Sequence, residues 1–296
     1  MRGIESVQRR AGVVFLLPLV VLMLVFVVVP ELGTILLSFS EWKGIGAVKG
    51  NGLKNFLQLT RDKIFLQALL NTVRVGGVSA LVSLVVGLVV AISLQSLGAL
   101  ESVLYRTVIF IPVILPLTIV GLLFAFVFNL ETGILNQLLR VLGLGSAARA
   151  WLSEPKVAIW SITFVEIWKN TGLPMLMIYA SLITIPTSIY EAAHIDGASR
   201  LQMIRRISLP LTRPVIRMSL IYLFILGFRT YDLIYIMTKG GPGRLTTTVP
   251  VWMVETAYNF NNFGYAASMG VTLAVVILAL VGVGGFALRG ESYEMS

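Results

Sequence analysis

The sequence predicts an all-α, polytopic membrane protein with six transmembrane helices, and three observations support this fold class. Hydrophobic residues make up 57% of the 296 positions. Charged residues make up only 12%, whereas soluble domains usually carry about 25%. The apolar residues also gather in six long stretches, each near the roughly 20 residues that a helix needs to cross the hydrocarbon layer. Much of this chain must therefore be solvated by lipid.

The first predicted span covers residues 11–30, which carry no charge, and is expected to continue past Glu31 to about residue 38. Arg9 and Arg10 precede it, as basic residues precede the core of a secretory signal peptide. The apolar run exceeds the typical signal core of about 7–15 residues, however, and has no A-x-A-like end. We therefore expect an uncleaved first helix.

Three further spans are predicted from uncharged stretches. The second lies at residues 75–100 and the third at residues 107–130. The sixth lies within residues 256–288 and is expected to begin near Tyr265. Uncharged runs of this length are typical of transmembrane helices.

The fourth predicted span, residues 156–182, contains Glu166 and Lys169. Each charge costs about 2.5–3.5 kcal/mol at the bilayer centre on insertion scales, whereas each aliphatic residue returns only about 0.3–0.6 kcal/mol. This helix should therefore be stable only against other protein. Pro174 is expected to kink it and to free backbone carbonyls that need partners or water.

The fifth predicted span, residues 218–238, carries Arg229 and Asp232, so both charged spans belong inside a bundle. Two interpretations of the charges stay open. Each pair, with a spacing of three, could form a local ion pair on one helix or pair with a neighbouring helix. Alternatively, polar groups of both spans line a path for a solute. The candidate path residues are Glu166, Lys169, Asn170, Arg229, Tyr231, Asp232 and Tyr235.

A polar, arginine-rich loop at about residues 185–214 separates these two spans. Ser188 and Glu191 have the S-x-x-E spacing, which predicts a capping box at the start of a short helix. Gly197 can end this helix, because glycine tolerates the left-handed backbone conformation. A second short helix is expected at about residues 199–207.

The orientation is predicted from charge near the membrane. Six spans place both termini on one side, and the total number of basic residues in the two sets of loops does not decide which side. Arginines crowd the loop at residues 185–214 and stand beside the first helix at Arg9 and Arg10. This pattern favours the cytoplasm for both termini and for the loop.

The same loop contains a pattern that resembles a known motif. The matching residues are Glu191-Ala192-Ala193, Gly197, Ile207 and Leu209-Pro210, with Pro210 expected to close the second short helix. Their spacing resembles the EAA motif of permeases in binding-protein-dependent ABC importers. Asp196-Gly197-Ala198 resembles the fuller D-G-A form common in carbohydrate importers. The resemblance implies a loop that docks on a separate ATPase, with Glu191 as an electrostatic contact and Gly197 as the pivot.

Shorter matches extend the resemblance along nearly the whole chain. They are Asn71-Thr72, Trp168-Lys169, Asp232 with Lys239-Gly240-Gly241-Pro242, and Gly264-Tyr265-Ala266. They resemble the carbohydrate-uptake subfamily, and in particular the first permease of the maltose and glycerol-phosphate type pair. The resemblance implies a type I ABC importer permease fold. One transmembrane permease domain would cover residues 1–296, with core helices at about 70–288.

The resemblance also implies a set of partners. The chain lacks G-x-x-x-x-G-K-[ST], so it is expected neither to bind a nucleotide cofactor nor to be an enzyme. An ATPase dimer would bind ATP and Mg, and a second permease would complete the path for a sugar, oligosaccharide or related polar solute. An extracytoplasmic solute-binding protein would deliver that solute. The expected location is the bacterial cytoplasmic (inner) membrane, in contact with lipid.

Composition and spacing exclude several other classes. The net charge of +9 does not indicate nucleic-acid binding, because the basic residues stand in short segments between apolar runs. The chain has no cysteine and one histidine, His194, which excludes metal sites of thiolates or several histidines. An amino-acid, peptide or polyamine permease is the alternative within the importer class. A secondary transporter or channel would not explain the loop motif, and the position of His194 argues against an intramembrane Ser–His enzyme.

Overall fold

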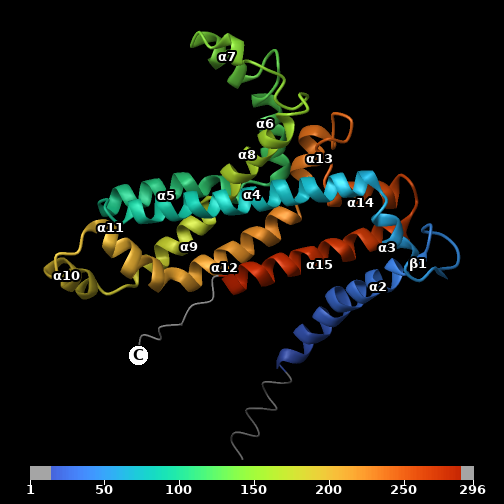
Figure 1. The fold of residues 1–296 in the computed structure, drawn as a ribbon, viewed down its shortest axis with the longest axis horizontal. Coiled ribbons are helices and arrows are strands. Elements are labelled where there is room, and N and C mark those ends of the chain that lie inside the picture. Colours follow the sequence, from blue (N-terminus) through green and yellow to red (C-terminus); the bar gives the residue numbers. More distant parts are fainter. Residues whose placement is uncertain (1–14, 288–296) are drawn as a thin grey trace, which may run out of the picture. The chain divides into compact units, whose positions relative to one another are not determined.

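The computed structural model describes residues 15–287, which are almost entirely helical (Figure 1). Among these, residues 15–62 together with Met253–Thr272 form one compact unit, and Lys63–Trp252 with residues 273–287 form another. Four helices in the described part are long and apolar enough to cross a membrane, or up to six spans result if each of two bent helix pairs counts as one. The all-α prediction is confirmed, with one two-stranded ribbon as the exception among the described residues.

The first unit begins with a helix over Phe15–Ser38, the predicted first span. Its elements are the π-helical turn η1 (Leu24–Val28), α2 (Val29–Ser38), the antiparallel strands β1 (Ser40–Glu41) and β2 (Lys49–Gly50), and α3 (Lys54–Leu59). Asn55 fastens the ribbon, because its Nδ2 donates to the carbonyls of Ser38 and Ser40 at 2.9 Å each. Gly264 lies so close to the ribbon that a Cβ there would collide with the Ser40 carbonyl.

The second unit is built around α4 (Lys63–Leu94). Its other elements are α5 (Ala99–Ile114), α6 (Leu117–Val127), α7 (Ile134–Val141), the 3₁₀ turn η2 (Gly145–Ala147), α8 (Ala158–Asn170), α9 (Gly172–Ile183), α10 (Thr187–Ile195), α11 (Arg200–Met203), the π-helical turn η3 (Ile204–Ser208), α12 (Leu209–Phe228) and α13 (Asp232–Thr238). Both α14 (Val249–Tyr258) and α15 (Phe263–Ala287) contribute residues to each unit.

Helix α4 packs against α8, α9 and α12, and glycines set how closely the helices approach. A Cβ on Gly227 of α12 would lie 2.8 Å from the Cα of Gly76, and a Cβ on Gly87 would lie 2.9 Å from the backbone nitrogen of Met175. These contacts bury an apolar core formed by Ala80, Leu84, Ala91, Leu94, Met175, Ile178, Leu182, Ile185, Leu220 and Leu223. The four helices thus form the scaffold that holds the polar groups described below.

The second and third predicted spans differ in detail from the observed helices. Helix α4 begins at Lys63, well before residue 75, because the early turns bury one face that includes Phe65 and Ala68. The third span is not one helix, since α5 and α6 are bent by 98° at Leu115 and Pro116. Leu115 has φ −72° and ψ 135°, the extended conformation that a following proline favours.

The fourth predicted span comprises α8 and α9, which meet at Thr171. This break lies three residues before Pro174, the residue that is expected to kink the span. Proline lacks the N–H that would bond the carbonyl of Asn170 in a continuous helix.

The predicted bounds of the fifth span, residues 218–238, and of the second short loop helix, residues 199–207, are wrong. One helix runs continuously over Arg200–Phe228 and passes Pro210 without ending. The wider π turn η3 directly precedes Pro210, as η1 precedes Pro30, and opens the hydrogen-bond ladder where a proline ring would clash. The helix ends instead at Phe228, and α13 starts only after a break of three residues.

Candidate functional site

Lys169 of α8 caps the end of α5. Its Nζ donates to the carbonyl oxygens of Pro112 (3.2 Å), Val113 (3.1 Å) and Leu115 (2.9 Å). These carbonyls lie where the helical hydrogen-bond ladder of α5 ends, although the carbonyl of Pro112 also accepts the N–H of Leu115 at 3.3 Å. A cation also complements the negative end of the helix dipole. Lys169 is only 7% exposed, so the three carbonyls replace the water that the ammonium group has lost.

Glu166, one turn earlier on α8, bonds a residue in the break between α12 and α13. Its Oε1 accepts hydrogen bonds from Thr230 Oγ1 (2.9 Å) and Asn170 Nδ2 (3.0 Å). Thr230 stands between α12 and α13, so this bond ties the end of α12 to α8. The other carboxylate oxygen, Oε2, is buried and has no hydrogen-bond partner in the described part of the chain.

Both structural explanations for the charges find support at α8, because Glu166 and Lys169 interact electrostatically on that helix and also bond groups of neighbouring elements. Lys169 donates to carbonyls at and just after the end of α5, and Glu166 accepts from Thr230 after α12 as well as from Asn170 on α8 itself. Arg229 follows the end of α12 and Asp232 opens α13. The helix is interrupted between them, so a spacing of three does not place them on one helical face.

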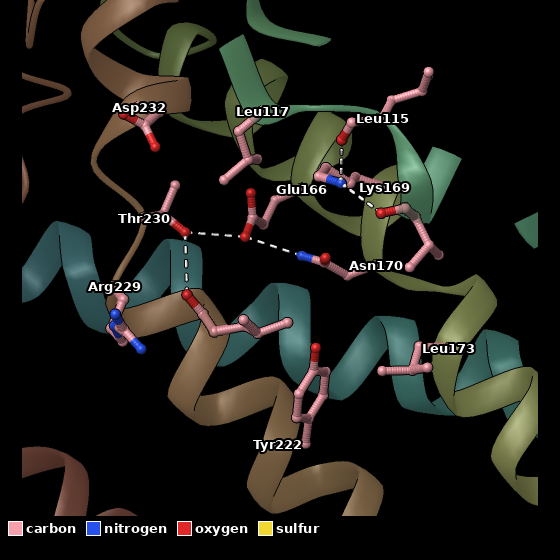
Figure 2. A pocket seen from close by; sticks show the side chains of 12 residues that line it. Leu115, Leu117, Glu166, Lys169, Asn170, Leu173, Tyr222, Arg229, Thr230 and Asp232 are labelled. Carbon is pink, nitrogen blue, oxygen red and sulfur yellow. Dashed lines mark hydrogen bonds between the residues drawn. The ribbon is translucent and has the colours of Figure 1, made fainter. Parts of the chain in front are cut away.

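A cavity of about 430 Å³ lies where these elements meet (Figure 2). Its lining residues are Val113, Leu115, Leu117, Glu166, Lys169, Asn170, Leu173, Tyr222, Leu226, Arg229, Thr230 and Asp232. The lining combines carboxylates, cations, an amide and hydroxyls with aliphatic side chains. Within residues 15–287, no group of three or more His, Asp or Glu side chains is placed to hold a metal ion.

The cavity brings together five of the seven predicted path residues, which are Glu166, Lys169, Asn170, Arg229 and Asp232. Tyr231 and Tyr235 are not among its lining residues. Their rings stack on each other, with centroids 5.3 Å apart and planes 14° apart, because the two residues are one turn apart at the start of α13. Sequence reasoning missed Tyr222 and Thr230, although a threonine directly after Arg229 was a usable signal.

The predicted coupling loop consists of α10, a tight turn and the start of the Arg200–Phe228 helix (Figure 1). Gly197 has φ +73°. The N–H of Ala198 bonds the carbonyl of Ala193 at 2.9 Å, and the N–H of Gly197 bonds that of His194 at 3.0 Å. These two bonds form a Schellman motif, which ends α10 as glycine was predicted to do.

The predicted capping box at Ser188 and Glu191 is wrong. Helix α10 starts at Thr187 after Pro186, and the structure shows no side-chain cap there. A capping box forms instead at Ser199, whose Oγ accepts from the N–H of Gln202 (3.3 Å) while the N–H of Ser199 donates to Gln202 Oε1 (2.7 Å). The N-cap of α10 is therefore Pro186, two residues before the predicted cap.

The motif residues of the loop occupy two helices. Glu191, Ala192, Asp196 and Gly197 are exposed, whereas Ala193, Ala198, Ile207 and Leu209 are half-buried and Pro210 is exposed. Tyr190 anchors α10, because its hydroxyl hydrogen-bonds Ser208 Oγ at 3.0 Å. An open groove of about 510 Å³ runs beside this helix and is lined by Tyr190, Glu191, His194, Ile195 and Met203.

Two of the shorter motifs also have a structural explanation. Asn71 Nδ2 donates to the carbonyls of Leu245 (2.8 Å) and Thr247 (2.9 Å), and Thr72 Oγ1 accepts from the N–H of Val249 (2.9 Å). These bonds hold the connection between α13 and α14 against α4. The turn after α13 includes residues with positive φ, among them Gly240 at +81°.

Comparison with known proteins places these features in a wider context. Residues 83–288 match the family described as binding-protein-dependent transport system inner membrane component. The chain is 34% identical over 281 residues to the sulfoquinovosyl glycerol transport system permease protein SmoG of Agrobacterium fabrum, covering 94% of this chain and 89% of SmoG. It is 31% identical over 273 residues to the trehalose/maltose transport system permease protein MalF of Thermococcus litoralis, covering 92% and 91%. A chain of a bacterial ABC transporter that imports the acidic polysaccharide alginate has a similar fold, with a TM-score of 0.82 at 24% identity over 98% and 99% of the two chains.

Proposed function

Because this chain belongs to the family of binding-protein-dependent transport system inner membrane components, we propose that it forms half of the path of an ATP-driven importer for a sugar, oligosaccharide or related polar solute. The observation that carries the proposal is the similarity, over about nine tenths of each chain, to permeases named for sulfoquinovosyl glycerol and for trehalose and maltose. The chain is a multi-pass membrane protein and a permease component, which is not itself catalytic.

The cavity supports a polyhydroxylated solute. Asn170 and Asp232 offer acceptors for sugar hydroxyls, while Asn170 and Arg229 offer donors. Leu117 and Leu173 supply the apolar surface on which a sugar ring can pack. Pockets for small ligands usually combine apolar walls with a few convergent polar groups, as this cavity does.

The loop supports coupling to a partner ATPase dimer. The exposed residues around Glu191 and Gly197 lie on and just after α10, which Tyr190 ties to Ser208 and which the Schellman turn ends. In this proposal the ATPase binds ATP and Mg and contacts the loop from the cytoplasm. The permease chain itself binds no nucleotide. A second permease and an extracytoplasmic binding protein complete the importer, and both termini of this chain lie in the cytoplasm of a bacterial cell.

Reconstitution tests this function. The chain is co-expressed with the ATPase, permease and binding protein encoded beside it, and uptake into liposomes is measured with trehalose, maltose, an amino acid, a short peptide and a polyamine. We expect ATP-dependent uptake of a sugar that saturates with the loaded binding protein. Uptake of only the amino acid, peptide or polyamine would contradict the assignment of a sugar substrate. Uptake without ATP would contradict the assignment to an ATP-driven importer.

A further inference from the structure

A pocket of about 440 Å³ lies away from the cavity, where the end of α4, the start of α5 and the end of α9 meet α10. We call it the Arg106 pocket. Its residues include Arg106 and Ser102 of α5, Tyr179 of α9 and Tyr190 of α10. Neither the solute path nor the coupling loop explains why an arginine is built into this position.

Arg106 is held in a fixed place with most of its donors unused. Its guanidinium carbon lies 4.6 Å from the centroid of the Tyr179 ring, and its Nε donates to the carbonyl of Ser102 at 3.0 Å. No described residue accepts a hydrogen bond from its two Nη groups. Guanidinium is suited to bidentate bonds with phosphate or carboxylate oxygens, so this arrangement presents a preorganised anion receptor.

Tyr179 adds a neutral donor beside the guanidinium. Its hydroxyl accepts a hydrogen bond from Ser102 Oγ at 3.0 Å, which leaves its own O–H free to donate. Arg106 carries the one formal charge among the lining residues of this pocket, all of which belong to the described part of the chain. The nearby carboxylate of Glu101 instead accepts from the N–H of Gly98 at the start of α5. The pocket therefore has a net positive polar end.

The rim of the pocket is aliphatic and open. Ile183 is 60% exposed and Val103 is 52% exposed, whereas Leu182 and Leu94 close the inner wall. An inorganic anion would use only the polar end. A molecule with an anionic head and a hydrocarbon tail would use both, with its tail along the apolar outer surface of α5.

We propose that the Arg106 pocket binds the phosphate of an anionic phospholipid from the cytoplasmic leaflet, with an acyl chain lying over Val103 and Ile183. The placement in that leaflet rests on the proposed function, which puts the α10 end of the molecule in the cytoplasm. Basic pockets between transmembrane helices on that side suit anionic headgroups. Because Tyr190 lines the pocket and also anchors α10, the bound lipid braces the base of the coupling loop.

Native mass spectrometry of the purified importer complex tests this assignment. Retention is measured after addition of phosphatidylglycerol, phosphatidylcholine or inorganic phosphate. We expect selective retention of phosphatidylglycerol, and an Arg106→Gln variant should weaken it about fivefold, the effect of removing one interfacial cation. Arg140→Gln, which removes an arginine from α7, is the matched control and should bind normally. Tyr179→Phe keeps the ring beneath the guanidinium and should weaken binding to a smaller extent, even if Arg106→Gln fails to assemble.

Equal retention of phosphatidylglycerol and phosphatidylcholine, or unchanged retention in both site variants, would overturn the proposal. Binding of inorganic phosphate that depends on Arg106, with lipid retention that does not, would assign the pocket to a free anion instead. Lipid retention is measured without transport, so its failure is distinct from failure of the import function.

Discussion

At the residue scale, the membrane-embedded charges of α8 stabilise broken helices. A helix that stops inside the bilayer leaves backbone carbonyls without water, and each such group costs free energy unless it finds a donor. Lys169 satisfies three carbonyls at the end of α5, and Glu166 holds Thr230 in the break after α12. The two side chains therefore allow two bends to exist beside the cavity.

Replacing Lys169 tests this role. Lys169→Met keeps much of the side-chain volume but removes the ammonium donor from the carbonyls of Val113 and Leu115, and each buried orphan group costs about 1–3 kcal/mol. The carbonyl of Pro112 keeps the N–H of Leu115. We expect a lower unfolding temperature of the complex, measured by a thermal shift. Lys156→Met, at an exposed lysine just before α8, is the control. A complex of unchanged stability in both variants would show that water satisfies these carbonyls.

Gly197 supports a second residue-scale prediction. A side chain at φ +73° strains the backbone by about 1 kcal/mol, and aspartate also adds a negative charge at the proposed ATPase contact. Gly197→Asp should reach the membrane yet lose solute-stimulated ATP hydrolysis and uptake. Gly143 has φ +76° and, like Gly197, no described atom within 4 Å of the position that a Cβ would take, so Gly143→Asp imposes the same strain elsewhere. Loss of coupling in both variants alike would attribute the effect to folding rather than to docking.

At the scale of elements, the crossing of α4 and α12 depends on glycine. The backbones approach so closely that a Cβ on Gly76 would lie 2.9 Å from the carbonyl carbon of Gly227. Close approach lets van der Waals contact replace the hydrophobic effect, which gives little drive between helices in lipid. This crossing positions the break after α12 against α8.

Adjacent glycines of α4 provide a matched test. Gly76→Val would force the α4–α12 crossing apart and should destabilise the complex by about 1–3 kcal/mol. Gly77→Val has the same helix propensity, and its Cβ would meet no described atom within 4 Å, so it should be tolerated. Thermal unfolding and uptake are measured for both variants, and equal effects would indicate helix propensity instead of packing as the cause.

At the scale of the whole molecule, the number of spans decides which loops share a side of the membrane. Six spans arise only if α5 with α6, and α8 and α9 with α10, each count as one span. The loop around Gly145 follows α6, whereas the loop around Gly197 follows α9. These loops then lie on opposite sides of the membrane.

Reporter fusions test this topology. An enzyme active only outside the cytoplasm should give a signal when fused at Asn51 or Gly145, and no signal at Arg200, because α10 and α11 are proposed to face the cytoplasm. A cytoplasm-dependent reporter should give the reverse pattern at each site. An external signal at Arg200 would exclude contact between the loop and a cytoplasmic ATPase.

The sequence by itself determined the membrane class, the approximate positions of the spans other than the fifth, the loop motif and the need of α8 for protein partners. These properties follow from local composition and spacing, as the positive φ of Gly197 does. Only the tertiary structure decided that Pro116 and the residues after Phe228 break their helices while Pro210 does not. Whether a helix breaks at a proline depends on its surroundings. Distant side chains can bond the carbonyls that a break exposes, or a π turn can accommodate the proline ring within a continuous helix. The partners of Lys169 and Glu166 depend likewise on how α5, α8 and α12 pack, and that long-range packing cannot be read from the spacing of charges along one helix.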